Sequence, residues 1–285
     1  MKVRVGAIGA RTITTCRLLL MFVVSGAAAA NIAVPGALTH VADVQPGETA
    51  SGSVSVINAT NEVQRVAVRI VDRIPAPQRQ FVEAGSLDRS AALMIVPETR
   101  EIVLAPQERR EIAFDIVAPP GDAIAPGSYW ATLLLEPEND LAGDDDEEDR
   151  DGASIVSRMR IAYGIIVHVN DPPFGAISID DVRMGEPAAG SPSNGSLLQA
   201  AFSVEGQRVV DADAQLQVFD RETGVQVVAS QPQRLRLYPG YPDVAAFELG
   251  ELPPGSYEVL VVAENERDDL FAVRLDLDVG AETPN

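Results

Sequence analysis

Short apolar stretches with period-two alternation recur along the chain from Asn31 onward, and no segment there keeps a helical period for three turns. Examples are Val54-x-Val56, Val66-x-Val68-x-Ile70, Ile112-x-Phe114-x-Ile116, Leu216-x-Val218 and Leu275-x-Leu277-x-Val279. Such alternation is typical of strands with one buried face. Because Pro, Gly and Asp separate these stretches at intervals of about 8–12 residues, the sequence predicts an all-β chain of immunoglobulin-like β-sandwiches.

The length of 285 residues exceeds what one small sandwich needs and suits two. A boundary is indicated at Pro172-Pro173, because paired prolines cannot continue a hydrogen-bonded ladder. The hydrophobic fraction of 46% allows a core in both parts. We therefore expect two immunoglobulin-like sandwiches in tandem and a short tail, over residues 31–171, 175–280 and 281–285.

An internal repeat supports this division. Pro126-Gly127-Ser128-Tyr129 and Pro254-Gly255-Ser256-Tyr257 each precede an apolar run, then acidic residues, then a further alternating stretch. In an immunoglobulin-like sandwich, a tyrosine at this point ties its hydroxyl back to the backbone at the corner between the sheets. We interpret Tyr129 and Tyr257 as structural tyrosine corners rather than ligand contacts.

Residues 1–30 have the layout of a cleaved secretory signal peptide. Basic residues precede the apolar run 18–24, and alanines 27–30 supply a cleavage site. The run is shorter than the roughly 20 residues of a spanning helix, so we expect no transmembrane anchor after cleavage. A chain exported by this segment would be periplasmic or secreted. The single cysteine, Cys16, lies in the segment, so the exported chain would be free of disulfides.

The formal net charge of −20 argues against nucleic acid as a partner, because phosphates would be repelled. Much of this charge lies in residues 136–152, which we expect to form an acidic loop in the first domain. Calcium takes oxygen ligands, so calcium-dependent adhesion is an alternative. The run lacks the Asp-x-Asp-x-Asp-Gly spacing of a calcium loop, and we predict no metal site.

Catalytic chemistry has no positive signal in the sequence. The two histidines, His40 and His168, fall on different expected strands, and no cysteine outside the signal peptide accompanies them. A zinc site is therefore not supported. The sequence also contains no Gly-x-Ser-x-Gly elbow and no phosphate-binding glycine loop. We expect no enzyme, no catalytic residue and no cofactor.

The last strand expected in the first domain, residues 157–169, is a candidate partner-binding strand. Its apolar face carries Met159, Ile161, Tyr163, Ile165 and Val167. At a sheet edge, free backbone groups of this strand can pair with a partner's strand while these side chains fill the partner's groove. The alternative is that the face packs on its own core, as a closing strand of any sandwich requires.

Several short motifs accompany the closing strand, and they are Val44-Gln45-Pro46-Gly47-Glu48, Gly52-Ser53-Val54-Ser55-Val56-Ile57-Asn58, Ile95-Val96-Pro97, Leu104-Ala105-Pro106-Gln107-Glu108 and Pro126-Gly127-Ser128-Tyr129. Together with the closing strand, they resemble the N-terminal domain of the periplasmic pilus (fimbrial) chaperone family over about residues 33–170. The resemblance implies two sandwiches in a boomerang and donation of residues 157–169 to an unfinished pilin subunit. It also implies a basic pair in the inter-domain cleft that anchors the subunit's terminal carboxylate. That pair is not found, because residues 32–44 and 163–166 contain no Lys or Arg.

The sequence therefore predicts a periplasmic chaperone-like protein that assists assembly of pilus or surface-fibre subunits by β-strand donation. The expected partners are a pilin-like or other surface subunit and, as a second candidate, an outer-membrane usher. The alternative is a secreted cell-surface or matrix interaction protein without chaperone activity, which accounts better for the missing basic pair.

Overall fold

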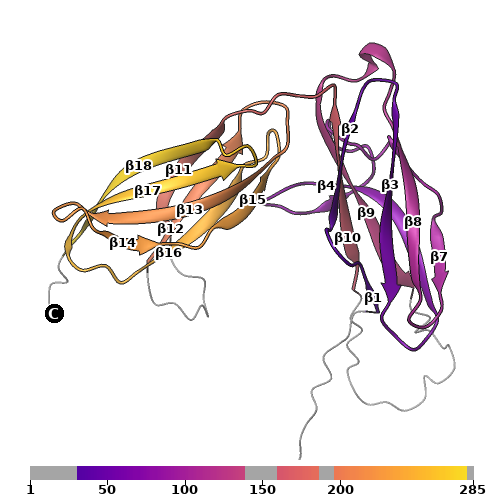
Figure 1. Ribbon diagram of the computed structural model, residues 1–285, viewed down its shortest axis with the longest axis horizontal. Coiled ribbons are helices and arrows are strands. Elements are labelled where there is room, and N and C mark those ends of the chain that lie inside the picture. Colours follow the sequence, from indigo (N-terminus) through magenta and orange to yellow (C-terminus); the bar gives the residue numbers. More distant parts are fainter. Residues whose placement is uncertain (1–30, 139–158, 186–195, 281–285) are drawn as a thin grey trace, which may run out of the picture.

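The computed structural model describes residues 31–138, 159–185 and 196–280, which form two β-sandwiches joined at an angle (Figure 1). In the first sandwich, one sheet has the strand order β1-β3-β8-β6, and the other has the order β2-β10-β9-β4-β5 with β7 also paired to β4. The bounds are β1 (Ile32–Ala33), β2 (Thr39–Val44), β3 (Thr49–Asn58), β4 (Gln64–Arg73), β5 (Phe81–Val82), β6 (Ile95–Pro97), β7 (Glu101–Leu104), β8 (Arg109–Val117), β9 (Gly127–Glu138) and β10 (Ile161–Val169). A single helical turn, η1 (Gly121–Ala123), occurs in the described part of the chain.

The second sandwich has one sheet of order β11-β12-β16 and one of order β14-β13-β17-β18, with β15 paired to β13. The bounds are β11 (Ile177–Gly185), β12 (Ser196–Val204), β13 (Val210–Asp220), β14 (Gln226–Ala229), β15 (Gln233–Leu237), β16 (Asp243–Gly250), β17 (Gly255–Asn265) and β18 (Leu270–Val279). The expected all-β architecture of two immunoglobulin-like sandwiches is therefore confirmed.

Period-two alternation builds the two cores. On β8, Ile112, Phe114 and Ile116 are at most 2% exposed, while the residues between them face solvent. Phe202 on β12 and Phe247 on β16 are the largest fully buried side chains of the second core. Full burial of one such side chain stabilises the fold by about 1.5–3 kcal/mol.

The connection between the sandwiches depends on a close backbone contact at Gly175. A Cβ atom added to Gly175 would lie 1.5 Å from the carbonyl oxygen of Glu205. Only glycine allows this approach without moving the loop after β12. That loop carries Gln207 and Val209, both of which bond to the first sandwich.

Three expected segments lie outside the described residues: the signal peptide 1–30, most of the acidic loop 136–152, and the tail 281–285. Of the acidic loop, the structure describes residues 136–138, which belong to β9. Within the described ranges, no helix is long and apolar enough to cross a membrane.

Both tyrosines of the internal repeat have the same local geometry. The Tyr129 hydroxyl donates to the carbonyl of Ala125 at 2.9 Å, and the Tyr257 hydroxyl donates to that of Pro253 at 2.7 Å. In each case the acceptor lies four residues upstream, in the connection that enters the strand. The hydroxyl thus fixes the direction in which β9 or β17 enters its sheet.

We expect Tyr257→Phe to lower the free energy of unfolding of the second sandwich by about 1 kcal/mol, because it removes one hydrogen bond and leaves a carbonyl unpaired. Urea unfolding followed by circular dichroism measures the change. Tyr129→Phe is the matched variant for the first sandwich. Unchanged urea midpoints in both variants would show that the corner bonds contribute no stability.

Candidate functional site: the β10 edge and the inter-domain cleft

The apolar face of β10 points into the first sandwich. Tyr163 is 7% exposed, and Ile165 and Val167 are fully buried. Ile161 packs on the same core from a partly buried position, whereas Met159 precedes the strand and is 49% exposed. The structure thus brings four of the five candidate binding residues together on the inner face and leaves Met159 outside.

The outer edge of β10 is covered along only part of its length. β2 runs parallel to β10 and pairs with it from Gly164, opposite Thr39, to Val169, opposite Val44. No strand in the described ranges pairs with the outer edge of residues 161–163. β10 therefore has a covered C-terminal part and an open N-terminal part, which we call the open edge.

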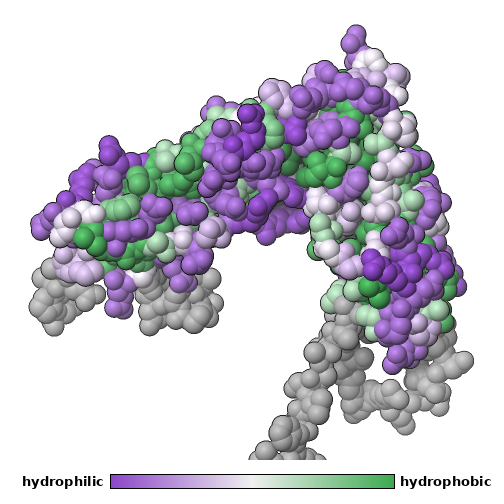
Figure 2. All heavy atoms as spheres, viewed as in Figure 1, coloured by the Kyte–Doolittle hydropathy of each residue, from purple (hydrophilic) through white to green (hydrophobic). Residues whose placement is uncertain are grey.

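A cavity of about 350 Å³ lies between the two sandwiches at the point where β2 begins. Ala162, Gly164 and Ile166 of β10 form part of its wall, so the open edge leads into it. Its charged lining consists of Arg73, Arg79, Arg234, Arg236 and Asp243. Figure 2 shows hydrophilic residues gathered on the inner side of the bend, where β15 faces the first sandwich. The lining is predominantly basic although the chain as a whole is strongly acidic.

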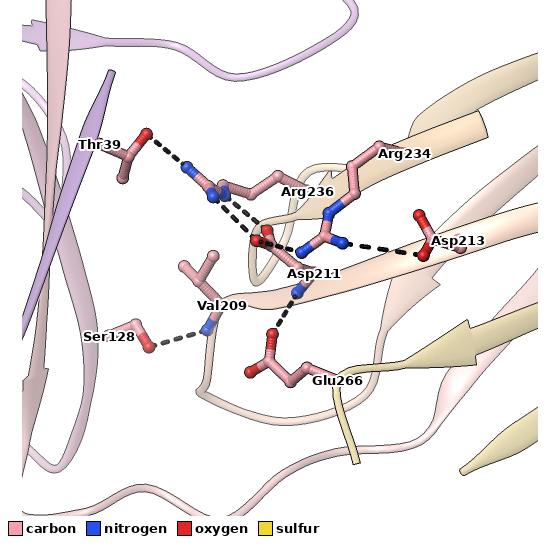
Figure 3. A network of polar contacts seen from close by, with 8 residues as sticks. All are labelled: Thr39, Ser128, Val209, Asp211, Asp213, Arg234, Arg236 and Glu266. Atoms are coloured by element: carbon pink, nitrogen blue, oxygen red, sulfur yellow. Dashed lines mark hydrogen bonds and ion pairs between the residues drawn. The ribbon is translucent and has the colours of Figure 1, made fainter. Parts of the chain in front are cut away.

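Arg236 crosses from the second sandwich to the first (Figure 3). Its Nη1 donates to Thr39 Oγ1 at 2.7 Å, while its Nε and Nη2 bond to the two carboxylate oxygens of Asp211 at 2.6 and 2.8 Å. Burial alone would raise the pKa of Asp211, but hydrogen bonds and charge from Arg236 and Arg234 outweigh it and hold that pKa below its ordinary value. Asp211 therefore keeps its negative charge and orients Arg236 toward β2.

Arg73 and Arg79 are the cleft arginines whose positive charge is least neutralised by nearby carboxylates. Arg73 ends β4, is exposed, and has no carboxylate within ion-pair distance in the described part of the chain. The Arg79 side chain is 63% exposed, and its Nη2 lies 3.8 Å from Asp243 Oδ1. Arg234 and Arg236, by contrast, share Asp211 at hydrogen-bond distance. An anion that enters the cleft would meet Arg73 and Arg79 as available donors.

An apolar cluster holds the two sandwiches together beside the cleft. Trp130 of β9 and Ile166 of β10 are each 3% exposed and pack with Val209 of the second sandwich. The Trp130 ring makes edge-to-face contacts with Tyr238 and Tyr241, at 4.9 and 5.9 Å between ring centroids. This contact fixes the angle at which the arginines of the second sandwich approach β2.

A buried hydrogen-bonded chain accompanies this cluster. The Val209 amide donates to Ser128 Oγ at 2.8 Å, and Ser128 Oγ lies 2.7 Å from His168 Nδ1. The Val209 amide occupies one of the two acceptor sites of the serine oxygen, and the tautomer of His168 decides whether the serine hydroxyl or the ring nitrogen donates in the second bond. Burial, assisted by the charge of Arg208, lowers the pKa of His168 to about 4.

The arginines of the cleft were not predicted from the sequence. The basic pair that the resemblance implies was expected on the first stretch and the closing strand, whereas the structure supplies the charge of the cleft from β4, the loop after it, and β15. One signal was available: Arg234 and Arg236 are two residues apart in an alternating stretch, so a strand places them on one face. In the described residues, no group of three or more His, Cys, Asp or Glu side chains could hold a metal ion.

No family model matches this chain, and no curated protein matches it in sequence. Among solved structures, it is similar to the class 5 fimbriae chaperone CfaA, at 11% identity over 86% of this chain and 98% of that one, with a TM-score of 0.44. It is also similar to the Escherichia coli chaperone DraB, at 10% identity over 87% of this chain and 96% of that one, with a TM-score of 0.40. A third is a chain from the Salmonella enterica complex of the SafA pilin with the SafB chaperone, at 7% identity over 88% of this chain and 97% of that one, with a TM-score of 0.41.

Proposed function

We propose that this protein is a periplasmic or secreted chaperone of surface-fibre assembly that binds a pilin-like subunit at the open edge of β10. The observation that carries the proposal is the position of this edge: residues 161–163 are unpaired on one side and lead directly into the arginine-lined cleft. An outer-membrane usher is the expected recipient of the bound subunit.

An unpaired strand edge is a template for a partner's strand, because its N–H and C=O groups satisfy those of the added strand. Met159 is exposed and Ile161 is partly buried, so both can contact the partner's apolar groove. Tyr163, Ile165 and Val167 already fill the core of the first sandwich. Contacts with the partner's groove are therefore made mainly by Met159 and Ile161, at the N-terminal end of the candidate strand.

The cleft supplies a place for the end of the added strand. A strand that pairs with residues 161–163 must stop where β2 begins, since β2 occupies the same edge from Gly164. Arg73 and Arg79 line the cavity at this point. Guanidinium groups bind carboxylates through two parallel hydrogen bonds, so a terminal carboxylate of the subunit fits this position. The basic anchor that the resemblance implies is thus replaced by arginines from other elements.

Co-expression of the mature chain with a pilin-like subunit from the same genome, followed by purification of the complex, tests this proposal. We expect Ile161→Asp to reduce complex formation at least tenfold, because it places a charge where an apolar groove closes. Val117→Asp, at an exposed position of β8, is the matched control and should leave the complex intact. Equal yields of complex from both variants would contradict strand donation and favour an interaction protein that binds through other surfaces.

The same assay tests the cleft. Arg73→Glu should weaken the complex at least tenfold, because it replaces an attraction with a repulsion next to a partner carboxylate. Arg183→Glu is the control with the same change of charge, because Arg183 is an exposed residue of β11 that does not line the cleft. If Arg73→Glu binds the subunit as tightly as Arg183→Glu does, carboxylate capture in the cleft is wrong even where strand donation holds.

A further inference from the structure

The last strand of the second sandwich, β18, has an edge that pairs with no strand in the described ranges, although β11 of the other sheet comes close to β18. β18 pairs with β17 from Leu270, opposite Glu264, to Val279, opposite Gly255, without a bulge. No strand in the described ranges pairs with its other side. In the first sandwich, β2 covers part of the corresponding edge of β10. β11, the first strand of the second sandwich, pairs only with β12 among the described strands and contains a bulge after Asp180.

The inner face of β18 is incompletely buried. Five apolar side chains of this face pack on the second core but remain partly exposed. They are Phe271, Val273, Leu275, Leu277 and Val279. Figure 1 shows β18 along one margin of the second sandwich, and Figure 2 shows hydrophobic residues on that side. A long, regular edge with an apolar inner face is a surface that pairs with another strand.

We propose that β18 pairs antiparallel with β18 of a second copy, about a two-fold axis at Leu275. In this register, Val273 lies opposite Leu277 of the second copy, and Phe271 lies opposite Val279 of the second copy. Every apolar inner residue from Phe271 to Val279 therefore meets an apolar partner. The two sheets become one continuous sheet, and the contact is closed and symmetric, as most homodimer contacts are.

Charge selects this register. On the outer face, Arg274 lies opposite Asp276 of the second copy, and the two-fold axis produces this pair twice. A shift of the axis to residue 274 places two arginines opposite each other, and a shift to residue 276 places two aspartates opposite each other. Axes between residues set apolar side chains against polar ones. An axis at Val273 also avoids these conflicts but sets Arg274 opposite Ala272, so the register about Leu275 is the one that pairs Arg274 with Asp276.

The second copy also relieves an existing repulsion. Within one chain, Asp276 lies directly opposite Glu258 on β17, and like charges in this arrangement destabilise a sheet. Arg221 bonds to Asp276 from one side, and Arg274 reaches Glu258 at 3.4 Å. An Arg274 side chain from the second copy adds a positive charge on the free side of Asp276. In the dimer, the pair of Asp276 and Glu258 in each copy therefore has arginine side chains next to it on both sides.

Sedimentation of the mature chain over a concentration series tests this dimer, in about 0.15 M salt so that distant charges are screened. We expect a reversible dimer in the wild-type protein. Arg274→Asp and Asp276→Arg should each raise its dissociation constant at least tenfold, because each turns both cross-strand pairs into like-charge pairs. Circular dichroism establishes that each variant is folded. A wild-type protein that stays monomeric up to roughly 1 mM overturns the proposal.

The charge-swapped combinations distinguish this register from any other contact. The double variant Arg274→Asp/Asp276→Arg should dimerise like the wild type, because both pairs are reversed together. An equal mixture of the two single variants should form a heterodimer, since one supplies two aspartates and the other two arginines. If the single variants dimerise normally, or if neither combination restores the dimer, β18 is not the contact. The inference does not depend on strand donation by β10, so the two proposals fail independently.

Discussion

Replacing Ile165 by aspartate is expected to unfold the first sandwich. Ile165 is fully buried at the centre of β10, opposite Ala131 on β9 and His40 on β2. An aspartate there would place a carboxylate in an apolar core without a partner, and such changes cost about 4–5 kcal/mol or more. That loss is comparable with the total stability of many domains.

Thermal unfolding by circular dichroism and limited proteolysis measure this effect. Val41→Asp is the matched control, because Val41 lies on the adjacent strand β2 and is 51% exposed. It should change stability by less than about 0.5 kcal/mol. A folded Ile165→Asp variant with wild-type stability would mean that the apolar face of β10 does not belong to the core. For the same reason, Ile161 and not Ile165 is the position at which partner binding is tested.

Acidification from pH 6.5 to pH 4 is expected to destabilise the contact between the sandwiches through His168. Its pKa falls from an ordinary value of 6.5 to about 4 in the folded chain, chiefly because of burial. Between these pH values the unfolded chain binds a proton that the folded chain does not. The contribution of neutral His168 to the free energy of unfolding is therefore complete above pH 6.5. It is lost progressively as the pH falls to 4, by about 3 kcal/mol in all.

His168→Gln isolates this effect from the protonation of carboxylates. A glutamine oxygen can still accept from the Ser128 hydroxyl but does not titrate in this range. Urea midpoints measured for both proteins at several pH values should converge at low pH as the wild type loses its advantage. Parallel pH profiles in the two proteins would show that His168 is not buried and neutral in the folded state.

The strands were predictable because one local rule determines them. Alternation in stretches such as Ile112 to Ile116 predicts one buried face, and the structure has it. The repeated Pro-Gly-Ser-Tyr motif likewise predicted an equivalent position in each sandwich, and it occupies the start of β9 and of β17. Both inferences needed only residues close together in the sequence.

The covering of β10 by β2 and the composition of the cleft were not predictable in this way. An alternating strand has the same pattern whether or not its edge is paired, so the sequence left both interpretations of Ile165 and Val167 open. The cleft joins Thr39 to Arg236, which are 197 residues apart. Such a contact depends on the angle between the sandwiches, which Trp130 and Tyr238 set by packing.

Hydrogen exchange of β10 amides, free and in complex with a pilin-like subunit, tests strand donation most directly. The Gly164 amide donates to Leu38 on the β2 side, so the amide of Ala162 faces the open edge, whereas those of Ile161 and Tyr163 face β9. We expect the Ala162 amide to exchange rapidly in the free protein and to become protected in the complex. Amides of residues 164–169, which lie between β2 and β9, should be protected in both states. A complex in which the Ala162 amide exchanges as fast as in the free protein would contradict donation by β10.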